Sequence, residues 1–267
     1  MKGDAEQRSM TDDRPVLRAR GLVRAFNGIR AVDAVDLSVS AGEILGVIGP
    51  NGAGKSTLFN LLAGELLPTA GTIELLGERV ERAPAATRLA QGMGRTFQIP
   101  RAFGALSVLE NVMLGAQDHA GERVFANWLA PSRVHAAERD AKARAMELLA
   151  FMKLAPLARE PARVLSIGQR KLLELARVMM AAPRVVLLDE PMAGVHPVLV
   201  ETLSERIAAL AREGTTFLLV EHQLSLIAAV CQRVLVMAAG RVLVSGSPAA
   251  VLADPRVAEA YLGGVTT

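Results

Sequence analysis

Residues 49–57 read Gly49-Pro50-Asn51-Gly52-Ala53-Gly54-Lys55-Ser56-Thr57, directly after the short apolar run Glu43-Ile44-Leu45-Gly46-Val47-Ile48. They fit the phosphate-binding pattern G-x-x-x-x-G-K-[ST]. Glycines let backbone N–H groups turn toward phosphate oxygens without a clash at Cβ, and a following helix adds the positive end of its dipole. The pattern predicts that Lys55 reaches the β- and γ-phosphates and that the Ser56 hydroxyl ligates Mg²⁺. The dinucleotide pattern G-x-G-x-x-G is disfavoured, because Thr57 stands where its last glycine would fall.

Strand and helix patterns alternate on both sides of this loop. Residues 16–39 indicate two antiparallel strands with a turn at Asn27-Gly28, and a helix is expected from Ser56 to Ala63. Further strands are predicted at Thr72–Leu76, Val185–Leu188, Thr215–Val220 and Val234–Met237, with helices at 198–212 and 223–231. This alternation predicts an α/β fold built on a mostly parallel sheet with both faces covered.

Composition limits the class of protein. The chain has 267 residues, 51% hydrophobic and 21% charged, so it has enough apolar residues to form a buried core. Its 30 basic and 27 acidic residues give only +3, a weak basis for nucleic-acid binding. The single cysteine, Cys231, excludes an internal disulfide framework. No apolar run approaches the ~18 residues of a membrane-spanning helix, so a membrane role requires a partner that spans. The polar start is no signal peptide, and residues 1–14 are expected to be disordered.

Between Ser107 and Ala182 the strand patterns give way to helical ones. This segment predicts a helical insertion in the α/β core. Residues 132–171 contain nine basic and four acidic residues, a local charge of +5. Two interpretations remain open: a solvated helical face, or a surface that docks on a partner or near anionic lipid headgroups.

An apolar strand, Val185–Leu188, ends in two acidic residues, Asp189 and Glu190. A carboxylate at the end of a buried strand near a phosphate loop can hold Mg²⁺, which is the role expected of Asp189. Glu190 is expected to polarise a water for in-line attack on the γ-phosphate.

The segment Leu165-Ser166-Ile167-Gly168-Gln169 resembles the LSGGQ signature of ATP-binding cassette (ABC) proteins, with Ile167 in place of the first glycine. Ser166 and Gln169 also form an S-x-x-Q capping box, so Ser166 should begin a helix. Such a helix start presents a hydroxyl, backbone N–H groups and a positive dipole end to an anion.

Other elements of the ABC pattern occur in the family's order. Gln98 matches the Q-loop, which links Mg²⁺ and the attacking water to the transmembrane partner. His222 matches the switch histidine that contacts the γ-phosphate, and Phe26 matches the aromatic residue that stacks on adenine. The resemblance covers about residues 16–262 and implies the following site. Catalytic roles are expected for Glu190, His222 and Gln98, and metal contacts for Ser56, Gln98 and Asp189. Residues expected to contact ATP are Phe26, Gly49, Pro50, Asn51, Gly52, Ala53, Gly54, Lys55, Ser56, Thr57, Ser166, Gly168 and Gln169.

Three features resemble the ATPase subunits of bacterial branched-chain amino acid importers: Arg95-Thr96-Phe97-Gln98, the stretch 116–133, and the tail from Asp254 to Gly263. Urea and short-chain amide importers share this subunit type. Alternatives are a lipopolysaccharide-export ATPase, which has a similar tail but generally lacks the Arg-Thr-Phe-Gln sequence, and a soluble ABC ATPase. A small-molecule P-loop kinase is disfavoured by Ser166–Gln169 and His222.

The resemblance implies a P-loop NTPase (RecA-like) core in a cassette of residues 15–264. An N-terminal antiparallel β-subdomain precedes an inserted α-helical subdomain at about 105–182, and a short tail covers 247–264. It further implies ATP and Mg²⁺ as ligands and a head-to-tail dimer with a second ABC ATPase, identical or different. Transmembrane permease subunits would hold the chain at the cytoplasmic face of the inner membrane, a periplasmic substrate-binding protein would act indirectly, and no nucleic-acid partner is expected.

One departure concerns the loop after Glu190, which reads Pro191-Met192-Ala193-Gly194-Val195-His196-Pro197. The family usually carries Asp, sometimes Asn, at the position of His196. Because the family's loop crosses the dimer interface, His196 predicts a pH-sensitive ATP turnover.

Overall fold

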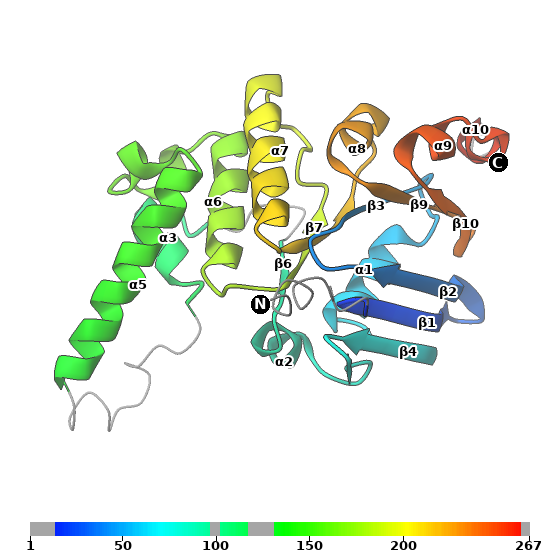
Figure 1. The fold of residues 1–267 in the computed structure, drawn as a ribbon, viewed down its shortest axis with the longest axis horizontal. Helices are drawn as coiled ribbons and strands as arrows, with labels where there is room; N and C mark the ends of the chain where they lie inside the picture. The colour runs from blue at the N-terminus through cyan, green and yellow to red at the C-terminus, as the bar shows by residue number, and fades with distance from the viewer. Residues whose placement is uncertain (1–13, 97–101, 117–130, 263–267) are drawn as a thin grey trace, which may run out of the picture.

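The computed structural model describes residues 14–96, 102–116 and 131–262, which contain two β-sheets and the helices around them (Figure 1). The smaller sheet is antiparallel, in the order β2-β1-β4-β5. Its strands are β1 Leu17–Phe26, β2 Ile29–Val39, β4 Ala70–Leu75 and β5 Glu78–Arg79. The predicted turn at Asn27-Gly28 joins β1 to β2, and both residues have positive φ, of 48° and 85°. Asn and Gly tolerate this conformation, which suits a tight hairpin.

The larger sheet has the order β10-β9-β3-β8-β7-β6 and is parallel from β9 to β6. Its strands are β3 Ile44–Ile48, β6 Met93–Arg95, β7 Val185–Asp189, β8 Thr216–Val220, β9 Arg233–Ala238 and β10 Arg241–Gly246. Every residue of β3, β7 and β8 is buried. Successive residues of β3 enter opposite cores, since Ile44 and Ile48 belong to one hydrophobic cluster and Leu45 and Val47 to the other. Two covered faces explain the uninterrupted apolar runs.

Helices cover the larger sheet and extend away from it (Figure 1). Those near the sheet are α1 Lys55–Ala63, α2 Ala85–Ala90, α7 Pro197–Arg212, α8 Leu224–Val230, α9 Pro248–Leu252 and α10 Pro255–Leu262. A helical group projects to the left in Figure 1, formed by α3 Val108–Met113, α5 Pro131–Phe151 and α6 Ile167–Met179, with short 3-10 turns at Ala155–Leu157 and Ala162–Val164. Helix α3 packs against both α5 and α6. These elements occupy the segment for which the sequence predicted helices.

The predicted strands and helices are confirmed with boundary shifts of one or two residues. Elements that the sequence analysis did not predict are β5, β6, β10, α2, α9 and α10. Helix α2 contains Arg88, which is fully buried and donates hydrogen bonds to the carbonyls of Leu61 (2.7 Å) and Leu62 (2.5 Å), in the last turn of α1. The expectation of disorder concerns residues 1–14, of which all but Arg14 lie outside the described residues.

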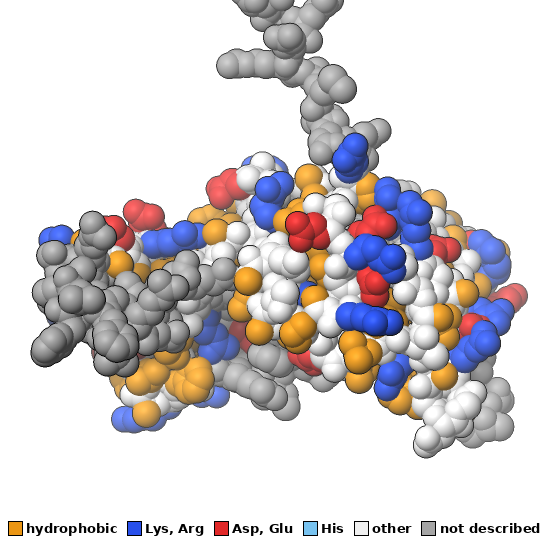
Figure 2. Space-filling model, turned by 90° about the horizontal axis from the view of Figure 1, so that it is seen from below, with side chains coloured by type: hydrophobic (Ala, Val, Ile, Leu, Met, Phe, Trp, Pro, Cys, Tyr) orange, Lys and Arg blue, Asp and Glu red, His pale blue; other side chains and the backbone are white. Residues whose placement is uncertain are grey.

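The surface seen in Figure 2 carries side chains of both charges. Lys and Arg are interleaved with Asp and Glu over the part of the molecule that holds the antiparallel sheet. Arg18 lies 3.6 Å from Glu74, and Arg79 lies 2.6 Å from Glu81. The described part of this face therefore carries no extended patch of one sign. Among the described residues, no helix has both the length and the apolar composition needed to cross a membrane.

Candidate functional site

The chemistry-bearing residues gather where three parallel strands end. The phosphate loop follows β3, Asp189 is the last residue of β7, and Glu221 and His222 follow β8. Asp189 pairs in register with Val220, so the ends of β7 and β8 are level. The carboxyl ends of parallel strands form the usual ligand-binding edge of an open α/β sheet. The fold therefore brings the predicted residues of three distant segments to one edge.

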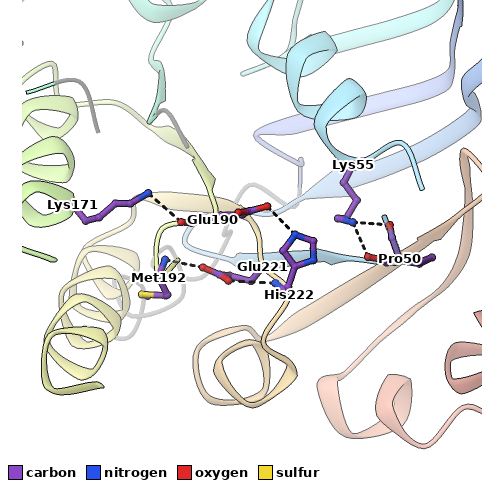
Figure 3. Close-up of polar contacts among 8 residues, drawn as sticks. Pro50, Lys55, Lys171, Glu190, Met192, Glu221 and His222 are labelled. Carbon is purple, nitrogen blue, oxygen red and sulfur yellow. Dashed lines mark hydrogen bonds and ion pairs between the residues drawn. The ribbon is translucent and has the colours of Figure 1, made fainter. Parts of the chain in front are cut away.

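The phosphate loop needs glycine at two positions for lack of space. A Cβ on Gly49 would lie 2.1 Å from the carbonyl oxygen of Met237, and one on Gly54 would lie 2.2 Å from that of Ala31. Gly54 has φ of +98° and is the N-cap of α1. The Lys55 side chain folds back over the loop, where its Nζ donates to the carbonyls of Gly49 (2.6 Å) and Pro50 (2.9 Å) (Figure 3). Burial lowers the pKa of Lys55, and the carboxylates of Glu190 and Asp189 oppose this shift.

A pocket of about 360 Å³ lies over this loop. It is lined by Ala31 and residues Asn51 to Thr57, together with Glu190 and His222. The predicted signature segment Ser166–Gln169, although described, is not among the lining residues. The pocket therefore combines the phosphate loop with Glu190 and His222 but receives nothing from the start of α6.

Asp189 is a buried carboxylate beside this pocket. Burial raises its pKa, and the guanidinium of Arg95, whose Nη2 lies 3.3 Å from Oδ2, opposes the rise. A buried carboxylate is costly unless a cation or hydrogen bonds compensate it. Arg95 supplies such a partner in this structure.

Glu190 and His222 contact each other directly (Figure 3). His222 Nε2 lies 2.8 Å from Glu190 Oε1, and the Glu190 side chain is about four-fifths buried. The Glu190 backbone has φ of +47°, unusual for a residue with a side chain, and its N–H donates to the carbonyl of Val220 at 3.0 Å. Positive φ in a non-glycine residue marks a conformation that the surrounding structure imposes.

Two residues that the sequence analysis missed hold this region in place. Glu221 is buried and accepts hydrogen bonds from the backbone N–H of Met192 (2.8 Å) and of His222 (3.3 Å). Burial raises the pKa of Glu221, and these two N–H groups oppose the rise. Lys171 on α6 donates to the Glu190 carbonyl at 3.2 Å. Glu221 stands beside His222, and Lys171 stands two residues after Gln169, but neither belongs to a motif with a defined spacing.

The start of α6 has the predicted capping box. Ser166 Oγ accepts from the Gln169 N–H at 3.3 Å, and Gln169 Oε1 accepts from the Ser166 N–H at 2.9 Å. Gly168 is buried against α7, where an added Cβ would lie 2.5 Å from Leu199 Cδ1. Ile167 is 54% exposed, which explains how this helix start accepts a large residue in place of the family's glycine.

Phe26 and Gln98 are less defined. Phe26, the last residue of β1, is 41% exposed, and the Arg24 guanidinium lies 4.6 Å from the centre of its ring. Phe26 is not among the described residues that line the pocket. Gln98 lies outside the described residues.

Comparisons with known proteins decide the family. A family model described as "ABC transporter" matches residues 32–193, and one described as "Branched-chain amino acid ATP-binding cassette transporter" matches residues 241–266. The chain belongs to the ABC transporter family. The second match falls on β10, α9 and α10, the tail that the sequence analysis singled out.

Curated relatives and solved structures agree with this family. The chain is 37% identical over 251 residues to the high-affinity branched-chain amino acid transport ATP-binding protein BraF of Pseudomonas aeruginosa, covering 94% of this chain and 98% of the relative. LivG of Escherichia coli K12, with the same description, is 37% identical over 250 residues, with 93% and 98% covered. A crystal structure of the ADP conformation of an ABC transporter cassette superposes with a TM-score of 0.81 at 32% identity, covering 93% of this chain and 99% of that one. The predicted fold class is confirmed, and the chain is an ABC ATPase.

Proposed function

We propose that this ABC ATPase binds and hydrolyses ATP as the motor subunit of an importer for branched-chain amino acids or related small polar solutes. The proposal rests on one observation: the phosphate loop, Glu190 and His222 line the same pocket. The cargo class rests on the relatives BraF and LivG and on the matching tail model. Neither the tail match nor the relatives favour the lipopolysaccharide-export alternative.

The phosphate loop fits a nucleoside triphosphate. Glycine at Gly49 and Gly54 lets the backbone come close to its neighbours, and the loop leads into the N-terminus of α1, where a chain of phosphates is favoured. Lys55 holds its own loop carbonyls in this structure, and we assign it to the β- and γ-phosphates when ATP is present. Phe26 is assigned to the adenine ring, with its exposed face as the support.

The donors beside the pocket fit Mg²⁺. Asp189 offers a carboxylate and Ser56 a hydroxyl, and hard oxygen donors are the ligands that Mg²⁺ prefers. Mg²⁺ is usually held by one or two carboxylates together with waters and phosphate oxygens. Bound Mg²⁺ would neutralise charge that develops on the phosphate oxygens. Gln98 is proposed as a further ligand from its sequence position alone.

Glu190 and His222 carry the proposed hydrolysis. Glu190 positions and polarises the attacking water, and its contact with His222 at 2.8 Å holds the carboxylate toward the pocket. Lys171 and Glu221 fix the backbone on either side, through the Glu190 carbonyl and the Met192 N–H. The strained φ of Glu190 is maintained by these contacts.

A second subunit completes the site in this proposal. Ser166, Gly168 and Gln169 at the start of α6 do not line the pocket of their own chain, so we assign this helix start to ATP held by a partner. Each ATP would then lie between the phosphate loop of one subunit and the helix start of the other. ATP binding closes the dimer, and hydrolysis with phosphate release opens it.

The permease contact is assigned to a second pocket of about 320 Å³, between α2, the end of β6 and α6. Its lining is mainly apolar, with Leu89, Met93, Leu114 and Val178 among the residues, and Arg95 and Glu65 at its polar side. An amphipathic cytoplasmic helix of a permease fits such a groove. This contact would place the subunit at the cytoplasmic face of the membrane, with the periplasmic binding protein acting from the other side.

The test is Glu190→Gln, with Glu213→Gln on the exposed end of α7 as the matched control. Glu190→Gln should keep ATP binding, lower the hydrolysis rate about 10²-fold or more, and accumulate ATP-bound dimers. Glu213→Gln should behave as the unmodified protein. Hydrolysis at the unmodified rate would remove Glu190 from its proposed role. In vesicles containing the assembled transporter, ATP should drive leucine uptake, and uptake of urea or an amide instead would reassign the cargo.

A further inference from the structure

Arg95 connects Asp189, the carboxylate proposed to hold Mg²⁺, to the groove assigned to the permease. It is the last residue of β6, and its side chain is 14% exposed. One guanidinium nitrogen, Nη1, donates to Asn60 Oδ1 at 2.8 Å and lies 3.1 Å from Glu65 Oε2. The other, Nη2, lies 3.3 Å from Asp189 Oδ2. A single planar group therefore contacts two carboxylates that belong to different parts of the molecule.

The two carboxylates face different sites. Asp189 ends β7 at the edge that holds the phosphate loop, whereas Glu65 follows α1 and lines the groove together with Arg95. Asn60 lies on α1 itself, the helix that begins at the phosphate loop, so the guanidinium also contacts the side of that helix. Arg95 is thus in contact with the groove, with α1 and with Asp189 at the same time.

The chemistry of arginine suits this place. Its guanidinium has five N–H donors in a fixed plane, so a shift of one partner turns the whole fork and changes the contact to the other. A lysine ammonium would keep the charge but carries no such rigid fork. The Nε of Arg95 is buried without a hydrogen-bond acceptor among the described residues, so the orientation of the plane is set by the contacts at Nη1 and Nη2.

We propose that Arg95 is a positioning residue through which occupancy of the groove reaches Asp189. When a permease helix enters the groove, it displaces or reorients Glu65, which is 38% exposed, and the guanidinium moves with it. The Asp189 carboxylate then changes its orientation toward the nucleotide. This inference rests on the proposed function, since it requires a permease in the groove.

The experiment compares ATPase activity of the isolated subunit with that of the complete transporter in vesicles. The unmodified protein gives the stimulation ratio, and the variants are Glu65→Gln, Arg95→Lys and both together, with Glu213→Gln as the control. Glu65→Gln should lower the stimulation about fivefold or more, where stimulation is the activity of a variant in the transporter divided by the activity of the same variant as an isolated subunit. Arg95→Lys should lower the stimulation to the same level. The double variant should lose no more than either single variant, because both act on one connection.

Each outcome decides a specific claim. Full stimulation of Glu65→Gln and Arg95→Lys would overturn the role of Arg95 while leaving the importer function intact. Losses that multiply in the double variant would also overturn it, because the two residues would then act independently. If the unmodified protein shows no stimulation by the permease, the proposed function fails, and the inference about Arg95 fails with it. Glu65→Gln lies on the surface, so a folding defect at Arg95 cannot hide the result.

Discussion

At the scale of single residues, the phosphate loop shows how space and backbone conformation select glycine separately. Gly52 has φ of +76° and open space around its missing Cβ. Gly54 has φ of +98° and a backbone oxygen 2.2 Å from where a Cβ would stand. Position 52 requires only a left-handed backbone conformation, whereas position 54 also has no space for a Cβ atom. The G-x-x-x-x-G-K-[ST] pattern requires Gly49 and Gly54 and leaves Gly52 free, which matches the two crowded positions.

Substituting the two glycines is therefore expected to lower the free energy of unfolding by different amounts. Gly52→Ala should destabilise the protein by about 1–2 kcal/mol, the cost of left-handed backbone for a residue with a Cβ. Gly54→Ala should cost at least about 2 kcal/mol more, because the segment containing Ala31 must move to relieve the overlap. Urea unfolding of the two variants measures the difference. Equal losses of stability in the two variants would mean that the loop relaxes freely and that the close approach of Ala31 does not destabilise Gly54→Ala.

His196 is the residue at which this chain departs from its family's pattern. It is exposed, it is the N-cap residue of α7, and it makes no side-chain cap hydrogen bond. The neighbouring residues Val195 and Leu199 pack on Gly168 at the start of α6, so His196 lies on the face assigned to the second subunit.

A histidine at this place predicts pH-dependent turnover. Histidine is the side-chain type whose charge changes near physiological pH, whereas asparagine does not ionise. The ATPase rate of the unmodified protein, divided by that of His196→Asn, should therefore change between pH 8 and about pH 5.5. A ratio that stays constant from pH 8 to about pH 5.5 would dismiss the hypothesis.

At the scale of helices and strands, two capping boxes of the same pattern allow helix stability and function to be tested separately. Ser107 and Glu110 cap α3 as Ser166 and Gln169 cap α6, each with both hydrogen bonds present. Aspartate is as good an N-cap residue as serine, and the capping partner at α6 is the neutral Gln169, so Asp at position 166 should preserve that helix. At Ser166, however, its negative charge would face the triphosphate of the partner.

Ser166→Asp is therefore expected to unfold within about 0.5 kcal/mol of the unmodified protein and to lose most ATPase activity. Ser107→Asp is the control for a change of N-cap residue away from the ATP site, and it should keep its activity. Its stability should fall, because the new carboxylate replaces a hydroxyl that donates to Glu110 Oε2 at 2.6 Å. The measurements are urea unfolding and steady-state ATPase rates. If both variants remain active, the start of α6 serves only to begin a helix, and its assignment to ATP is wrong.

The sequence predicted elements well where a local signal exists. The strands β3, β7 and β8 are buried on both faces and therefore appear as apolar runs. Strand β10 was missed because its turn uses Ala239-Gly240, with φ of 46° and 80°, and alanine carries none of the usual turn chemistry. Strand β6 has three residues including a glycine, too few for any alternation. Helix α2 buries Arg88 completely, the reverse of the expected amphipathic pattern.

The proposed site residues that lie together in the structure could be found in the sequence for the same reason. The phosphate loop, Asp189, Glu190 and His222 are local patterns at strand ends, and the parallel sheet brings them together. Arg95 contacts Asp189 across 94 positions of sequence, and Lys171 contacts the Glu190 carbonyl across 19. Such contacts leave no periodic trace in one sequence, because only the fold sets which distant residues meet.

At the scale of the whole molecule, the pocket and the start of α6 belong to one chain but do not meet in it. Three apolar side chains around the α6 start are exposed: Val164, Ile167 and Val198 are 57%, 54% and 64% exposed. A head-to-tail dimer would cover them and bring each α6 start to the other pocket. In such a dimer every ATP site is made from two chains, so a group lost from one chain can be supplied by the other.

Two inactive variants should then restore activity when they are combined. Lys55→Ala removes the amine assigned to the phosphates, and Ser166→Asp spoils the contact offered to the partner, so dimers of either variant have no intact site. A mixed dimer has one intact site, formed by the phosphate loop of the Ser166→Asp chain and the α6 start of the Lys55→Ala chain. Mixing the two proteins should therefore recover ATPase activity. A chain with both changes, mixed with Lys55→Ala, should recover none, because no intact phosphate loop remains. Mixtures as inactive as their components would place the whole ATP site within a single chain.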